Sequence, residues 1–481
     1  MLFLGVSTGG WGAAVMERVS CEAPAPEEED GECAPSEFQM DSDEDSSVTV
    51  EEEEEHFAMV ARVVVCCAAV LLFTREDDEP HFSHPNHFSE HLLHMLQSRH
   101  SRRFLDAYGV SSEFFLDLVE FLEIEGTPPN IPVQVTAPEK LALFLLWARS
   151  GASVQEVASK HGFARSTVRL CIKQATAALA SHFETYVRLP SHIPELMHDD
   201  PRFRPLRGAI GAIDGCLCPL NTRMLEARRV ECFRDRKGRI STNLMAISSL
   251  NHRYTLNFLC CGCEGRASDS GIWNVVQRHI TLPDGAFLLG DAGFPLVKCR
   301  ILTPYLTVRY HLKEWAESAR HRPCNKKELF NLRHAQLRCE VEQSFGIWKR
   351  RFKIIQHPPE FYDLQEYARV ILPSLAVLHN KIRQDVDEFE QHPELSSDVV
   401  TALEAIASNC ATEEHICALR GVGGERKRAH LSFNSDAVAW RDSIADAMWD
   451  DYSQEMSRRG VEIEEDNETA EKIAEKLRIT R

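Results

Sequence analysis

The sequence has no apolar run long enough to cross a membrane. Its longest, Val63–Phe73, has 11 residues, whereas a transmembrane helix needs about 20. The first 20 residues also lack the basic segment that opens a secretory signal. We therefore expect a protein of the nucleus, with the cytoplasm as a second location, whose 16 cysteines are reduced thiols. The single CxxC, within Cys260–Cys263, lies in a predicted strand, so buried cysteines are expected there rather than a zinc site.

Basic residues are nearly missing from the first 61 positions, which hold 17 acidic residues and one Arg. This segment carries −16 of the total net charge of −19, so the low overall pI says little about the remaining chain. Because Glu22–Glu55 has few large apolar residues, we predict that residues 1–61 form an acidic disordered tail.

Three short motifs each present a carboxylate at a different structural junction. Asp214 closes an apolar run, Ala209–Ile213, that predicts a buried strand, and Asp291 follows a second such run and precedes the turn signal Gly293. Glu342 lies instead on a predicted helix. Carboxylates that converge from neighbouring strands and a covering helix repel one another unless cations separate them. The pattern therefore predicts a site for a hard divalent metal ion.

The segments between these motifs indicate the fold class. Thr242–Ser248 and Tyr254–Cys261 are predicted strands joined by a polar turn, as in an antiparallel hairpin, and a helix is predicted for Asp269–Arg278. Three strands, a helix, a further strand and later helices give the element order of an α/β fold of the ribonuclease-H-like class, a mixed sheet flanked by helices.

The chain resembles a known family. Residues from about 95 to 385 are similar to the PIF/Harbinger transposases and the Harbinger-derived nucleases of the DDE superfamily. Besides the three carboxylate motifs, the resemblance rests on Phe233–Arg239 with Asn243, on Gly265–Ser270 and on Leu378–Asn380.

The resemblance implies that Asp214, Asp291 and Glu342 are a catalytic triad that holds two Mg²⁺ or Mn²⁺ ions for cleavage or strand transfer of DNA phosphodiesters. Asp269 is a candidate fourth metal ligand, or else the N-cap of the helix that begins there. The structural alternative is that Asp214 ends a strand, Asp291 forms an Asx turn and Glu342 is a surface charge. The resemblance also implies a separately encoded Myb/SANT-like partner.

The sequence departs from the family pattern near the site. Cys216-Leu-Cys218 follows the first Asp-Gly where many relatives have a histidine, Ser268 replaces the family's His before Asp-Ser, and Phe294 replaces a Tyr. Histidines near a metal can orient its ligands or the substrate. A domesticated derivative that binds DNA or protein without cutting therefore stays open as the second function class, and a ribonuclease on the same fold as a third.

Basic side chains beside these motifs suit a polyanionic substrate, since phosphate contacts give affinity without sequence information. The candidates for DNA contact in the catalytic region are Arg234, Arg236, Lys237, Arg239, Lys349 and Arg350.

A helix-turn-helix motif is predicted upstream. Ser153 is the expected N-cap of its first helix, Ala158 the small residue at the helix crossing, Gly162 the left-handed turn and Val168 the core anchor of the second helix. That second helix would present Arg165, Thr167, Arg169 and Lys173 as groove or phosphate contacts. The alternative is that the two helices are purely a packing unit.

The predicted organisation is therefore an acidic tail (1–61), an all-α region with the helix-turn-helix (90–195), the ribonuclease-H-like nuclease domain (205–385) and a helical and polar C-terminal tail (386–481).

Overall fold

The computed structural model describes residues 87–98, 101–124, 135–193, 200–306, 308, 322–359, 362–385, 435–461 and 463–469, with residues 472 and 475. The predicted acidic tail and the apolar run Val63–Phe73 lie outside these residues. Within them, no helix combines the length and apolar character that a bilayer span requires.

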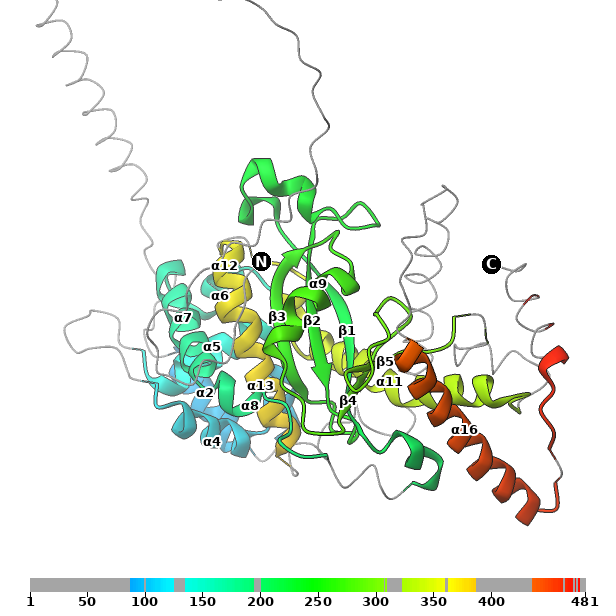
Figure 1. Ribbon diagram of the computed structural model, residues 1–481. Helices are drawn as coiled ribbons and strands as arrows, with labels where there is room; N and C mark the ends of the chain where they lie inside the picture. Colours follow the sequence, from blue (N-terminus) through cyan, green and yellow to red (C-terminus); the bar gives the residue numbers. More distant parts are fainter. Residues whose placement is uncertain are drawn as a thin grey trace, which may run out of the picture.

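A five-stranded mixed sheet forms the centre of the molecule (Figure 1). Its strands are β1 (Ala209–Pro219), β2 (Ser241–Ser248), β3 (Leu256–Glu264), β4 (Phe287–Leu289) and β5 (Ile301–Leu302). Their order across the sheet is β3-β2-β1-β4-β5. The predicted hairpin is confirmed, because β2 pairs antiparallel with both β1 and β3. β4 pairs parallel with β1 and with β5, so the sheet is compatible with a nuclease fold.

The two faces of the sheet carry separate apolar cores, because successive strand side chains point to opposite faces. Ile213, Met245 and Ile247 pack with the short helix α9 (Asp269–Val276) on one face. Leu244 and Cys216 belong to the larger core on the other face. This alternation decides which face each site residue occupies.

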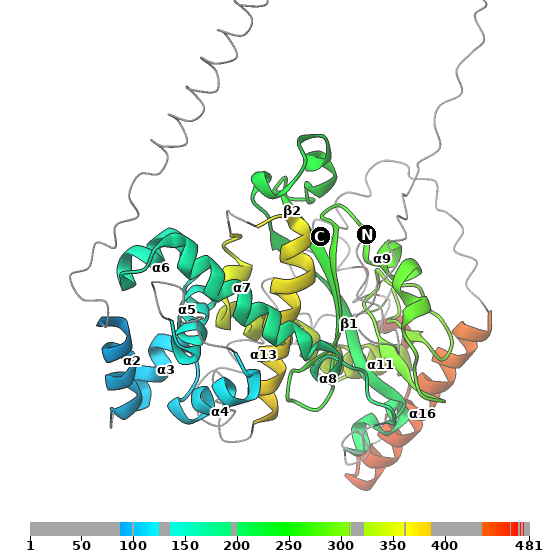
Figure 2. The same ribbon diagram turned by 90° about the vertical axis from the view of Figure 1, so that its left-hand side faces the viewer.

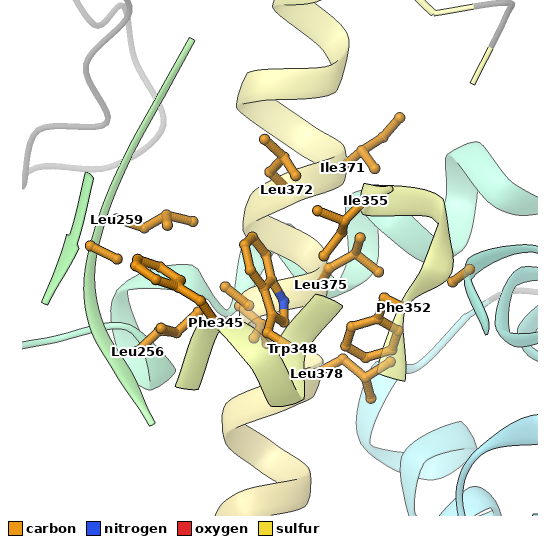
Figure 3. Packing of buried hydrophobic residues seen from close by; sticks show 14 of the residues in the cluster. Leu256, Leu259, Phe345, Trp348, Phe352, Ile355, Ile371, Leu372, Leu375 and Leu378 are labelled. Atoms are coloured by element: carbon orange, nitrogen blue, oxygen red, sulfur yellow. The ribbon is translucent and has the colours of Figure 1, made fainter. Parts of the chain in front are cut away.

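Helix α11 (Lys326–Arg351) covers that second face together with α13 (Leu372–Gln384). Phe345, Trp348 and Phe352 meet Leu375 and Leu378 of α13 there, with Leu256 and Leu259 of β3 beside them (Figure 3). A short π-helical turn, η7 (Tyr367–Ile371), links α12 (Leu364–Glu366) to α13. Large buried rings such as that of Trp348 each remove a large apolar area from water.

The N-terminal helices pack against α13 on its side away from the sheet (Figure 2). They are α2 (His87–Gln97), α3 (Ser101–Tyr108), α4 (Ser112–Leu122), α5 (Ala137–Ser150), α6 (Val154–His161), α7 (Arg165–Ser181) and α8 (Phe183–Tyr186). The remaining short elements are η2 (Pro201–Leu206), η3 (Thr222–Met224), η4 (Ala227–Phe233), η5 (Gln277–His279) and η6 (Lys353–Ile355). The apolar core of the N-terminal helices is continuous with the core beneath α11 and α13.

The local features predicted for α6 and α7 are present. Ser153 caps α6 in a capping box with Glu156, and Gly162 ends α6 with a φ of 74°. Ala158 and Val168 are buried, at 1 % and 0 % exposure. Helix α7 begins at Arg165.

Helix α16 (Ser435–Arg458) packs along the N-terminal half of α11 and against η2. The Arg441 guanidinium lies 4.0 Å from the ring centroid of Tyr305, and the Tyr305 hydroxyl donates to Asp442 at 2.6 Å. Lys326 pairs with Asp446 at 2.6 Å. The charged side chains of α16 thus bind this helix to α11 and to Tyr305.

Glu340 connects α11 to the turn between β2 and β3. One of its carboxylate oxygens accepts from the His252 backbone N–H at 3.0 Å, while the other lies 3.1 Å from His252 Nδ1. Burial raises the pKa of Glu340 to about 8, against the opposing effect of the backbone hydrogen bond.

Replacing Glu340 by Gln should change how stability depends on pH. Between the ordinary pKa of 4.5 and about 8 the folded wild type binds more protons at this position than the unfolded chain. Its contribution to stability therefore declines as the pH rises through that window. Urea unfolding should show Glu340→Gln gaining stability relative to wild type from about pH 5 to pH 8. Glu113→Gln, at an exposed position, is the control. A pH-independent difference would contradict the assignment.

Candidate active site

Asp214 lies within β1 rather than at its end. The strand continues to Pro219 because β2 pairs with it as far as Ser241, and Asp214 itself stands opposite Ala246. The expectation that Asp214 closes the strand was therefore wrong. Its neighbour Ile213 faces α9 and Cys216 faces α11, so the alternation along the strand directs Asp214 toward α11.

Asp291 follows the short strand β4 and stands level with Asp214. Ala212 of β1 is paired with Leu289 of β4 in parallel register, so Asp214 and Asp291 each stand two residues beyond this pair. Asp291 is 4 % exposed, and its Oδ1 accepts from the Gly293 N–H at 2.8 Å. The Asx-type turn offered as the structural alternative is thus present, and it fixes the direction of this carboxylate.

Glu342 approaches from α11, as the sequence predicted for a helical carboxylate. Arg338 stands one turn earlier on the same helix and bridges the two elements. Its Nη1 donates to Asp214 Oδ2 at 3.1 Å, and its Nη2 donates to Glu342 Oε1. The Arg338 side chain is 6 % exposed, against 17 % for Asp214 and 20 % for Glu342. A charge-assisted fork of this kind links β1 to α11 at the candidate site.

The pKa of Asp214 reflects the charged groups near it. Burial raises the pKa of Asp214 well above its ordinary value, the positive charge of Arg338 opposes this, and Asp291, Glu342 and Asp269 each raise it further. We call Asp214, Asp291, Glu342 and Asp269 the acidic cluster. His334 of α11 adds no cation, because burial lowers its pKa to about 3, and its Nε2 lies 3.0 Å from the Leu302 carbonyl oxygen.

Asp269 meets the cluster from the other face of the sheet. The N-cap of α9 is Ser268, whose hydroxyl accepts from the Gly271 N–H at 3.2 Å, so the expectation that Asp269 is the N-cap was wrong. A Cβ built on Gly215 would stand 2.1 Å from Asp269 Oδ1 and 3.4 Å from Asn243 Oδ1. The absent side chain at Gly215 is therefore what lets the Asp269 carboxylate lie against β1.

Asn243 adds a buried acceptor beside Asp269. Its Nδ2 donates to the Ala267 carbonyl at 3.1 Å, whereas its Oδ1 is buried with no hydrogen-bond partner among the described residues. A buried acceptor normally has a donor. The sequence analysis placed Asn243 in a motif without giving it a role, and alternation along β2 puts it on the same face as Met245 and Ile247, which pack against α9.

The donor chemistry of the acidic cluster suits Mg²⁺ or Mn²⁺, which prefer carboxylate oxygens. In the part of the chain that the structure describes, however, no three His, Cys, Asp or Glu side chains stand together in an arrangement that could hold a metal ion. Between Asp214 and Glu342 the structure places a guanidinium instead.

The predicted DNA contacts of the catalytic region are distributed unevenly. Arg234 pairs with Glu231 at 2.7 Å, and Arg239 pairs with Asp235 at 3.2 Å. Lys349 donates to the Leu217 carbonyl of β1 at 2.9 Å. Three further candidates are exposed, namely Arg236, Lys237 and Arg350.

On α7 the basic residues share one face. Arg165, Arg169 and Lys173 recur at intervals of four residues and are exposed, while Thr167 is half-buried. The Arg169 guanidinium lies 5.8 Å from the centroid of the Tyr362 ring. Such a row presents positive charge to solvent along one side of the helix.

Residues 213–380 match the family model of the DDE superfamily endonucleases. No curated protein and no solved structure matches the chain significantly. The matched DDE region begins one residue before Asp214 and ends at Asn380, so it contains the whole acidic cluster and Arg338. A domain of this superfamily implies a nuclease that acts on DNA, and members of the superfamily generally use divalent metal ions.

Substituting Gly215 by Ala tests the close approach of Asp269. The new methyl group must displace the carboxylate, and an overpacked site of this kind loses about 1–3 kcal/mol. Asp269→Ala in the same background should recover part of that loss, as measured by urea unfolding of all four combinations. Gly346→Ala is the control, because no atom lies within 4 Å of its added Cβ. Strict additivity of the two substitutions would show that the residues do not touch.

Proposed function

We propose that the chain is a metal-dependent DNA endonuclease of the transposase type, related to the PIF/Harbinger group, with Asp214, Asp291 and Glu342 as its catalytic carboxylates. One observation carries the proposal. Within the region that matches the DDE model, the pairing of β1 with β4 places Asp214 and Asp291 level with each other, and Arg338 of α11 links Asp214 to Glu342. Like charges held close together and away from water destabilise a fold. Cations bound between the carboxylates would offset this cost, and a metal-dependent nuclease needs such cations.

The protein's own residues supply the positions for this chemistry. Divalent ions, when bound, activate a water or a 3′-hydroxyl and stabilise the leaving oxygen of a phosphodiester. The rigid strand β1 holds Asp214, the Asx-type turn aims Asp291, and Glu342 lies on a helix whose buried side chains fix its position. Asp269, placed against Gly215, is the candidate fourth ligand.

DNA is held by the exposed basic residues in this proposal. The row Arg165, Arg169 and Lys173 on α7 belongs to a helix-turn-helix formed by α6 and α7. The loop after β1 contributes Arg236 and Lys237, and Arg350 contributes from the end of α11. By resemblance, a Myb/SANT-like partner assists DNA binding, and the protein acts in the nucleus.

The alternative is a derivative that binds DNA without cutting it. The bridge of Arg338 to Asp214 and Glu342 favours it, since an internal cation already satisfies two of the three carboxylates. The histidines that the family carries near the site are also replaced here.

Asp291→Asn separates the two functions. The substitution keeps the shape and the hydrogen bond from Gly293 but removes a charge that metal ligation needs, so Mn²⁺-dependent cleavage of DNA should fall by at least about 10²-fold. DNA affinity in metal-free buffer should stay within about twofold. Asp284→Asn, at an exposed position before β4, is the control. Wild-type protein that neither cuts DNA nor gains thermal stability from Mn²⁺, with and without a Myb-like partner, would establish the binder instead.

Replacing Arg165, Arg169 and Lys173 by Ala tests the role of α7. Each lost phosphate contact should lower the slope of log affinity against log salt by about 0.9. Fluorescence anisotropy on duplex DNA at several salt concentrations measures both affinity and slope. The charge-matched control replaces Arg102, Arg103 and Arg458, which are exposed elsewhere. If the two triple variants bind alike, α7 has no special contact with DNA.

A further inference from the structure

Arg338 is the cation that the structure places in contact with the acidic cluster. It lies four residues before Glu342 on α11, and its two terminal nitrogens divide between Asp214 and Glu342. The guanidinium is nearly inaccessible to solvent, and it lowers the pKa of Asp214 against the effect of burial. Its position is therefore set by the two carboxylates and by the packing of α11 on β1.

This contact lets the site fold without metal ions. Asp214 is surrounded by Glu342, Asp291 and Asp269, all of which disfavour its ionised form. An uncompensated buried charge costs several kcal/mol, while a paired and hydrogen-bonded one costs far less. The planar fork of arginine can serve two carboxylates at once, which an ammonium group does less well.

The same contact competes with metal binding. Asp214 Oδ2 and Glu342 Oε1 accept hydrogen bonds from the guanidinium, and these are the oxygens that an ion between the two residues would use. A divalent ion and a guanidinium also repel each other at such short range.

We propose that Arg338 is an internal counterion that must release Asp214 before a divalent ion can bind, so that it sets the metal affinity of the site. The inference rests on the proposed function, because it assumes that Asp214 and Glu342 are metal ligands. It adds that the site has two exclusive states, one closed by Arg338 and one occupied by metal, and that the free energy of the Arg338 bridge is subtracted from metal binding.

Calorimetric titration of the full-length protein with Mn²⁺, without DNA, tests the proposal. Arg338→Met keeps an unbranched side chain, shorter than that of arginine, and removes the charge, so it should bind Mn²⁺ at least about 10-fold more tightly than wild type while melting at a lower temperature in metal-free buffer. Arg338→Lys keeps the charge but loses the fork, so its affinity should lie between the two. Arg300→Met is the matched control. Arg300 donates to the carbonyls of Gln277 and Ile280, at 3.2 and 3.0 Å.

The outcomes distinguish this inference from the proposed function. If wild type binds Mn²⁺ and Arg338→Met binds it equally or more weakly, Arg338 is no competitor and the inference fails while the metal site stands. If neither protein binds Mn²⁺, the proposed function fails. Should Arg338→Met not fold, Arg338→Lys decides, and an affinity no tighter than wild type overturns the inference. Tighter binding must also disappear in the double variant with Asp291→Asn, since otherwise the ion binds elsewhere.

Discussion

The repulsion among desolvated carboxylates is the constraint around which the centre of this protein is arranged. Parallel pairing of β1 with β4 places Asp214 and Asp291 level with each other, and α11 contributes Glu342. Such a group is stable only with a cation among its members. Arg338 provides it from the same helix as Glu342. Charge balance within the site and the docking of α11 on the sheet are therefore one interaction.

Helix α11 is polar in sequence but largely buried in the fold. Its buried polar side chains are accommodated because they bind backbone groups of neighbouring elements. Asn331 exchanges two hydrogen bonds with the backbone of Tyr305, and Glu340 accepts from the turn between β2 and β3. Asn380 of α13 does the same for Leu256 at the start of β3. Side chains that bind backbone groups cannot slide by a residue without losing both partners. The carboxylates thus stand on elements whose register is fixed by polar contacts.

Much of this could be predicted from the sequence, since apolar runs and turn residues report strands and caps locally. The hairpin of β2 and β3, the helix that carries Glu342 and the cap at Ser153 all follow from such patterns. The extension of β1 beyond Asp214 could not be predicted, because it depends on pairing with β2 across the intervening loop. The pair of Arg338 with Glu342 could have been predicted, because Arg and Glu four residues apart on a helix can interact. The contact of Arg338 with Asp214 could not, because it joins two elements distant in sequence.

The residues that depart from the family pattern have structural roles that the sequence alone did not show. Cys216 and Cys218 are buried within β1, where they pack beneath α11, and Ser268 caps α9 so that the adjacent Asp269 lies against Gly215. Cys216 and Cys218 thus contribute to the core beneath α11, and Ser268 contributes to the start of α9. Under the two functions proposed here, a nuclease differs from a binder in the strength of one ion pair. We infer that a bridge from Arg338 to Asp214 that yields to a divalent ion would permit catalysis, whereas one that does not yield would leave a stable fold with exposed basic residues.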